Sequence, residues 1–340
     1  MAVIRCRSWC KILSGMLLGN VEINEIGRRW YSRDMKTDWN KLRPMIQQRI
    51  EKRLIGYPLR YMIPIAKEVL LARSTLIHGV SALLKALPVV TCKNCPEVYI
   101  GEKGHMIRSC RGFKQLNKNQ VHEWIKASLN DILVPVETFH LENLAQDVIM
   151  HHERFNHERV PVIVELCCQA GAYPQDFDFR SSNCMSKATE SAVEFSSCTL
   201  SANELMTIGN RTLSAWEILR EGVKKLLLVY HAKVCKYCSE VHVGPSGHKA
   251  RLCGVFKCEH WRGNHFWQKA SVDDLVPPKM VWCRRPQDPL VLLHEHRSYY
   301  GHLPAVVDLC SKAGAMPPAK YSCMMKIQGL SGPPPDFISG

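Results

Sequence analysis

The sequence lacks any unbroken run of the roughly 20 apolar residues that a membrane-spanning helix needs, and its mean hydropathy is slightly negative. We therefore expect a protein that does not insert into a membrane. The 340 residues are 46% hydrophobic and 22% charged, a globular composition that excludes a collagen-like or largely disordered chain. This length suffices for one large domain or two smaller ones.

The sequence also lacks the signatures of several enzyme classes. It contains no H-E-x-x-H zinc-protease motif, no G-x-x-x-x-G-K-[ST] phosphate loop and no G-x-S-x-G nucleophile elbow. Zinc deaminases place a proline directly before their C-x-x-C pair, whereas Thr91 and Val234 stand at that position here. These absences favour a binding protein over an enzyme.

Acidic residues are missing before Glu22, and the same segment carries Arg5, Arg7 and Lys11. The long apolar core of a secretory signal peptide is also missing, so the disulfides of a secreted protein do not explain the 16 cysteines. A basic, amphipathic N-terminal segment is typical of a mitochondrial presequence, and so is an arginine, here Arg29, three residues before a possible cleavage site that follows Tyr31. We expect a transit peptide over residues 1–31, a basic leader over 32–75 and a location in the matrix; an ordinary basic N-terminal helix is the alternative.

Basic residues outnumber acidic ones by 45 to 31, which gives a formal net charge of +14. Such an excess favours a polyanionic partner, either nucleic acid or an anionic membrane surface. The charge alone does not distinguish the two.

One pattern occurs twice, with matched residues 143 positions apart. It begins with a C-x-x-C pair at Cys92 and again at Cys235, and it extends to Gly171 and Gly314. Such self-similarity indicates two copies of one structural unit. The predicted segments are a first unit over 76–180, a linker and the start of a helix over 181–218, a second unit over 219–323 and a disordered tail over 324–340.

Apolar spacing within each unit predicts a helix, a metal loop, a short helix, an extended segment and a final helix. The short helix is expected to carry His122 and Trp124. The final helix starts near Pro161 and buries Cys167, or Cys310 in the second copy. The predicted fold class is α+β, predominantly α-helical, with two tandem repeats built around zinc-knuckle-like loops.

The metal loop has the pattern C-x2-C-x9-H-x4-C in both units. Zinc binds thiolates at about 2.3 Å in a tetrahedron, so two ligand sulphurs lie roughly 3.8 Å apart, which a two-residue spacer permits. Gly104 and Gly247 precede the histidines and allow the backbone to bend. The predicted ligands of two structural zinc ions are Cys92, Cys95, His105 and Cys110, and Cys235, Cys238, His248 and Cys253.

The choice of histidine stays open, because His122 and His265 also keep the 143-residue offset. They could replace His105 and His248 as ligands, or form hydrogen bonds to the set of ligands. An iron–sulphur cluster fits less well, because such clusters usually take four thiolates or, in one class, two histidines.

Basic and aromatic residues alternate in and after each loop, a pattern typical of single-stranded RNA binding. The predicted contacts are Lys103, Arg108, Arg111, Lys114 and Trp124 in the first unit, and Lys249, Arg251, Lys257, Arg262 and Trp267 in the second. Two alternatives stay open: the tryptophans could pack under the loops as part of the core, and the basic residues could simply be solvated.

The doubled C-x2-C motif, the segment Asp131-Ile-Leu-Val-Pro-Val-Glu-Thr-Phe-His140 and the segment from Glu158 to Gly171 resemble the plant APO family, named for accumulation of photosystem I. The resemblance covers residues 76–323. It implies an organellar RNA-binding protein with two APO domains that acts in intron splicing or transcript stability, here in mitochondria, and so in respiratory complex biogenesis. It also implies a link to stable assembly of complexes that contain 4Fe-4S clusters. A protein–protein scaffold is the remaining alternative.

Overall fold

The structure is a computed structural model of the chain, and it describes residues 58–110, 121–142, 148–174, 200–251, 253 and 263–326, with five further positions between 42 and 49. The chain divides into the units Met1–Arg49 and Ile50–Gly340, and the helices and strands named below all belong to the second. The predicted transit peptide, the predicted tail from 327 onward and residues 181–199 of the predicted linker lie outside the described residues.

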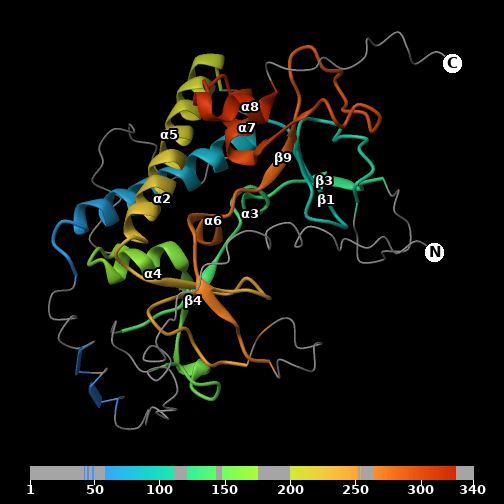
Figure 1. The fold of residues 1–340 in the computed structure, drawn as a ribbon. Coiled ribbons are helices and arrows are strands. Elements are labelled where there is room, and N and C mark those ends of the chain that lie inside the picture. Colours follow the sequence, from blue (N-terminus) through green and yellow to red (C-terminus); the bar gives the residue numbers. More distant parts are fainter. Residues whose placement is uncertain are drawn as a thin grey trace, which may run out of the picture. The chain divides into compact units, whose positions relative to one another are not determined.

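The two repeats have the same order of α-helices and β-strands, and Figure 1 shows the chain with part of these elements labelled. The first repeat consists of α2 (Ile63–Ala86), β1 (Val89–Cys92), β2 (Val98–Ile100), β3 (Trp124–Lys126), α3 (Leu129–Ile132), β4 (Glu137–Phe139), a 3-10 turn (Arg154–Asn156), β5 (Arg159–Pro161) and α4 (Val162–Gln169). The second consists of α5 (Ala202–Leu226), β6 (Ala232–Cys235), β7 (Val241–Val243), β8 (Trp267–Lys269), α6 (Val272–Leu275), β9 (Met280–Cys283), β10 (Gly301–Pro304) and α7 (Ala305–Lys312). A 3-10 turn (Ala319–Tyr321) and α8 (Ser322–Met325) follow. The start of α2 lies inside the segment predicted as a basic leader.

Helices and strands are mixed in the described residues, which qualifies the expectation of a predominantly helical fold. Each repeat has a three-stranded antiparallel sheet, in the orders β2-β1-β3 and β7-β6-β8, and a two-stranded sheet, β4-β5 or β9-β10. The expected short helix at Trp124 is wrong, because this residue lies in β3 and pairs with Cys92 of β1. The strand is only three residues long, so its extended form comes from pairing with β1 rather than from a local pattern.

The long helices α2 and α5 pack against each other and form the centre of the main hydrophobic core. A sequence signal marks the start of α5, where Ser201 and Glu204 form a capping box. Close approach of the two helices depends on glycine: a Cβ added at Gly222 would lie 2.3 Å from Val69, and one added at Gly79 would lie 2.0 Å from Thr212.

By length and composition alone, α2 would qualify for a membrane span, with a hydropathy of 1.3. The lack of an unbroken apolar run therefore does not by itself exclude a membrane-spanning helix, because such a helix can contain a few charged residues. In this structure α2 buries seven side chains, and its buried face belongs to the core shared with α5.

The two repeats exchange halves: the three-stranded sheet in the first half of each repeat packs against elements in the second half of the other. Sheet β2-β1-β3 of the first repeat contacts β9 and α7 of the second, while β7 of the second repeat contacts β4 and α4 of the first; Figure 1 shows β9 beside the sheet that carries β1 and β3. Equivalent side-chain hydrogen bonds connect the repeats at both of these contacts. The Gln169 side chain donates to the Val243 carbonyl over 3.1 Å, and Lys312, 143 positions later, donates to the Ile100 carbonyl over 2.6 Å.

The metal loops take part in this exchange. The N–H of Met106 donates to the carbonyl of Leu292, and the N–H of Lys249 donates to that of Ile149, each over 2.8 Å. Each loop is thus held by the second half of the other repeat. The sequence repeat describes the covalent unit, while the packed unit combines the first half of one repeat with the second half of the other.

Candidate metal centre

Each candidate centre is assembled at one end of a three-stranded sheet. In the first repeat, Cys92 ends β1, Cys95 lies in the turn toward β2, and His122 lies two residues before β3. The backbone pairing of Cys92 with Trp124 brings the two ends of the loop together. Cys110 comes from the loop between β2 and β3.

Three sulphurs and one imidazole nitrogen converge in both repeats. The ligand atoms of four residues in each group lie within 4.8 Å of one another. The groups are Cys92, Cys95, Cys110 and His122 in the first repeat, and Cys235, Cys238, Cys253 and His265 in the second. Both groups could hold a metal ion.

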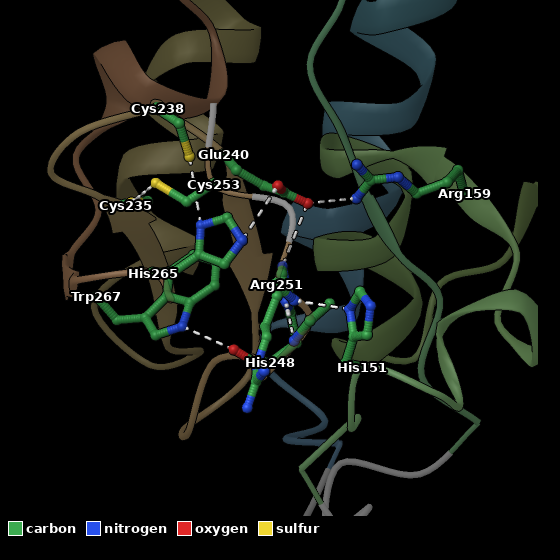
Figure 2. A network of polar contacts seen from close by, with 11 residues as sticks. His151, Arg159, Cys235, Cys238, Glu240, His248, Arg251, Cys253, His265 and Trp267 are labelled. Atoms are coloured by element: carbon green, nitrogen blue, oxygen red, sulfur yellow. Dashed lines mark hydrogen bonds and ion pairs between the residues drawn. The ribbon is translucent and has the colours of Figure 1, made fainter. Parts of the chain in front are cut away.

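The distances within these groups suit a tetrahedral ion. The Cys92 and Cys110 sulphurs are 3.9 Å apart, as are those of Cys235 and Cys253. This matches the edge of roughly 3.8 Å expected for zinc bound to thiolates at about 2.3 Å. The His265 Nδ1 atom lies 3.3 Å from the Cys238 sulphur (Figure 2), and the corresponding distance from His122 to Cys95 is 3.4 Å.

The histidines placed among the sulphurs are the alternates, His122 and His265, and not His105 and His248. His248 is turned away from the sulphurs, because both of its ring nitrogens face a carboxylate or a backbone N–H group instead. Its Nε2 atom lies 3.2 Å from the Glu240 carboxylate, and its Nδ1 atom accepts the N–H of Ala250. His105 is held in the same way, with Nε2 3.3 Å from Glu97 and Nδ1 accepting the N–H of Ile107.

The Gly-His pair has a role that the spacing alone does not indicate. Gly104 and Gly247 have φ of +71° and +69°, a left-handed conformation that favours glycine. In addition, a Cβ added at Gly104 would lie 2.3 Å from the Trp124 indole, and one added at Gly247 would lie 2.7 Å from that of Trp267. Each glycine therefore provides the space in which the tryptophan packs.

Both tryptophans pack under their loops. The Trp267 ring lies 4.8 Å from the rings of His248 and His265, and its Nε1–H donates to the His248 carbonyl over 2.9 Å. Trp124 contacts His105 and His122 at 4.8 and 4.9 Å. These contacts support the core alternative over base stacking by these two rings.

Glu240 connects the second centre to the first repeat. Its carboxylate lies 3.6 Å from His265 Nε2 and accepts a hydrogen bond of 2.8 Å from Arg159 of β5 (Figure 2). Although burial acts to raise it, the pKa of Glu240 is lowered to about 2 by His248 and Arg159. A carboxylate behind a ligand histidine orients the ring and raises its basicity.

The pKa values of three candidate ligands affect metal binding in different ways. Burial, followed by the charge of His248, lowers the pKa of His265 to about 4, so the ring is neutral at neutral pH and keeps a lone pair. Burial acts to raise the pKa of Cys92, but N–H groups of Asn94 and Cys95 point at its sulphur and hold the pKa below its ordinary value. Burial raises the pKa of Cys95 to about 12. A metal must therefore displace that proton when it binds.

The eight basic residues among the predicted RNA contacts fall into two groups. Lys103, Arg108, Lys249 and Arg251 are exposed on the metal loops. Arg111, Lys114, Lys257 and Arg262 lie outside the described residues. The backbone N–H groups of Arg108 and Arg251 donate to His294 and His151 of the other repeat, over 3.1 and 2.9 Å. The exchange thus fixes the loops while their cations face solvent.

Several residues around the centres were missed by the sequence reasoning. Glu97 and Glu240 obey the 143-residue offset, and this regularity could have marked them. Arg159 had no such signal, because His302 stands at its matched position and the two act on opposite repeats. Cys167 and Cys310 are fully buried, as their helical spacing predicts.

Comparison with known proteins gives one family. The APO RNA-binding family model matches residues 28–183 and 179–327. The chain is 35% identical to "APO protein 2, chloroplastic" of Arabidopsis thaliana, over 80% of this chain and 68% of that protein. It is 34% identical to "APO protein 1, chloroplastic" (87% and 76%) and 32% identical to "APO protein 3, mitochondrial" (78% and 72%) of the same organism. No solved structure matches.

Proposed function

Because the chain belongs to the APO RNA-binding family, we propose that it is a mitochondrial RNA-binding protein in which each repeat holds one structural zinc ion. The ligands are Cys92, Cys95, Cys110 and His122 in the first repeat, and Cys235, Cys238, Cys253 and His265 in the second. The observation that carries the proposal is the convergence of these four ligand atoms in both repeats. Three thiolates and one imidazole suit zinc better than an iron–sulphur cluster.

A structural zinc ion would supply folding free energy by joining the two ends of each loop. The chain's own residues provide the rest of the rigidity. Trp124 and Trp267 fill the space beneath the loops, and the other repeat holds the loop backbone through hydrogen bonds. This arrangement suits a surface that binds, and we propose no catalytic step.

RNA is the proposed partner, and single-stranded or intron RNA is the proposed form. The net charge of +14 supports a polyanion. Lys103 and Arg108, and Lys249 and Arg251, are exposed on the two loops, and we propose that they contact phosphates. Two binding loops on one RNA molecule would also gain affinity through effective concentration.

The proposed location is the mitochondrial matrix, and the proposed process is group II intron splicing or transcript stability in support of respiratory complexes. The basic segment 1–31 supports this location, and one of the relatives is a mitochondrial protein. We assign α2 to the protein core rather than to a membrane, because its buried face belongs to the core shared with α5. Fusing residues 1–31 to a fluorescent protein tests the location, and a chloroplast signal would contradict it.

Salt-dependent RNA binding by the full chain tests the proposed activity. The logarithm of affinity for single-stranded RNA should fall with the logarithm of salt concentration, by a slope of about 0.7 per phosphate contacted. Substituting Lys103 and Arg108 with alanine should reduce both affinity and slope without lowering the melting temperature. An affinity that does not change with salt would contradict the proposal.

A further inference from the structure

A cluster of two aromatic rings and one lysine lies beside the second metal centre. Tyr237 lies inside the C-x-x-C turn, and Phe266 lies directly before β8. Their ring centroids are 6.1 Å apart at 69°. The Lys236 ammonium group lies 5.9 Å from the Tyr237 ring and 5.8 Å from the Phe266 ring. We refer to these three residues as the aromatic cluster.

The backbone holds this cluster in place. The N–H of Lys236 donates to the Phe266 carbonyl over 2.9 Å. Directly beside it, Cys235 of β6 pairs with Trp267 of β8. The cluster therefore lies at the end of a paired sheet, directly beside the three candidate metal ligands Cys235, Cys238 and His265, and the paired backbone fixes its position.

The cluster also faces solvent. Phe266 is 47% exposed, Lys236 is exposed, and Tyr237 is partly buried. In the residues that the structure describes, no carboxylate lies within ion-pair distance of the Lys236 ammonium group. An accessible aromatic ring beside a cation is the combination with which proteins stack an unpaired base and contact its phosphate.

The first repeat has the same backbone but a different surface. The positions 143 residues earlier hold Lys93, Asn94 and Glu123. Lys93 forms an ion pair of 3.0 Å with Glu123, and no ring occupies either matched aromatic position. The lysine of the first repeat is thus neutralised by a carboxylate, whereas that of the second lies against aromatic rings.

We propose that Lys236, Tyr237 and Phe266 form a stacking subsite for an unpaired nucleobase of single-stranded RNA, and that only the second repeat carries it. The proposal rests on the proposed RNA-binding function and deepens it. Phe266 supplies the exposed face for the base, Tyr237 supports that ring at its edge, and Lys236 contacts the adjacent phosphate. The two repeats then have different tasks: the second stacks a base, and both contact phosphates.

Binding of fluorescein-labelled, mixed-sequence single-stranded RNA to the full chain tests this assignment. Phe266→Ala should weaken binding by about 5- to 150-fold, the range expected when one stacked base is lost. The salt slope should be unchanged, because the ring contacts no phosphate. Lys236→Ala should instead lower the slope by about 0.7. Double-stranded RNA of the same length should bind the wild type and Phe266→Ala equally.

Conservative and transplanted variants separate stacking from general packing. Phe266→Tyr should bind like the wild type, whereas Phe266→Leu keeps apolar bulk without an aromatic face and should be as weak as Phe266→Ala. The matched change Glu123→Ala in the first repeat should not weaken binding. The double change Asn94→Tyr and Glu123→Phe should strengthen it. Zinc content and melting temperature of every variant report whether the loop has stayed folded.

The outcomes distinguish this subsite from the general function. If the wild type binds RNA and Phe266→Leu binds as tightly with an intact loop, the stacking subsite is wrong while the RNA-binding function stands. If the wild type binds no RNA, both are wrong. Ultraviolet crosslinking gives an independent readout, because a nucleotide adduct should appear on the peptides that contain Tyr237 or Phe266. Adducts confined to other peptides would overturn the assignment.

Discussion

Arg159 of the first repeat donates a hydrogen bond of 2.8 Å to Glu240 of the second. At the matched positions, burial acts to raise the pKa of Glu97, but His105, then His122 and last His302 of the second repeat hold this pKa below its ordinary value. The carboxylate beside the second candidate centre therefore bonds to a residue of the other repeat, and the carboxylate beside the first is influenced electrostatically by one. Both metal loops are thus linked to the other repeat by side-chain electrostatics as well as by backbone hydrogen bonds.

The Arg159–Glu240 pair predicts a coupling between the repeats. Arg159→Ala should lower the free energy of unfolding by about 1 kcal/mol, a modest amount because the arginine side chain is 38% exposed and water screens the pair. Glu240→Gln should cost more, because that carboxylate also faces His248 and His265. A double-mutant cycle by chemical denaturation measures the interaction. Strictly additive effects would contradict a direct coupling.

The two histidines of each loop should behave differently when they are replaced. His122→Ala removes a proposed ligand, so the first repeat should lose its zinc. His105→Ala removes a buried ring that contacts Glu97 and Trp124, so it should lower the melting temperature while zinc remains bound. Metal analysis of the two variants checks this. Retention of zinc by His122→Ala together with its loss in His105→Ala would assign the ligand to His105 instead.

Gly104 should tolerate no side chain. Gly104→Ala places a Cβ against the Trp124 indole at a positive φ, and we expect a loss of about 1–3 kcal/mol from overpacking and strain. Trp124→Leu should make the alanine less costly, because it removes the indole from that space. If Gly104→Ala costs the same with and without Trp124, the packing explanation is wrong and backbone strain alone explains the loss.

The exchanged halves predict how fragments of the chain associate. Residues 50–199 and 200–340, produced as separate chains in one cell, should copurify, because each metal loop needs the second half of the other fragment. Produced alone, a fragment should aggregate or pair with a second copy in the same exchanged manner. Size-exclusion chromatography with light scattering distinguishes these states. A stable, folded monomer from either fragment alone would contradict the exchange.

The sequence was informative where spacing determines geometry. The C-x-x-C pairs and the third cysteine do converge, the long helices α2 and α5 do precede the loops, and Cys167 is buried as its spacing predicts. The 143-residue offset showed that the two loops share one set of cysteines and histidines. Covalent spacing and helical periodicity are local properties, and the sequence displays them directly.

The remaining features depend on contacts between distant segments. Spacing permitted either His105 or His122 beside the sulphurs, and the choice depends on Glu97, which faces one of them. Strand β3 is too short to be recognised without its partner β1. The exchange of halves leaves no local signal, because Arg159 and its partner Glu240 are 81 residues apart. Such features require the three-dimensional arrangement.

Native mass spectrometry of the full chain, before and after treatment with a chelator, tests the central claim most directly. We expect two zinc ions per chain at the start, and loss of both should abolish the folded loops and the binding of single-stranded RNA measured on the same sample. A chain that carries no zinc when isolated, yet stays folded and binds RNA as tightly, would contradict the account.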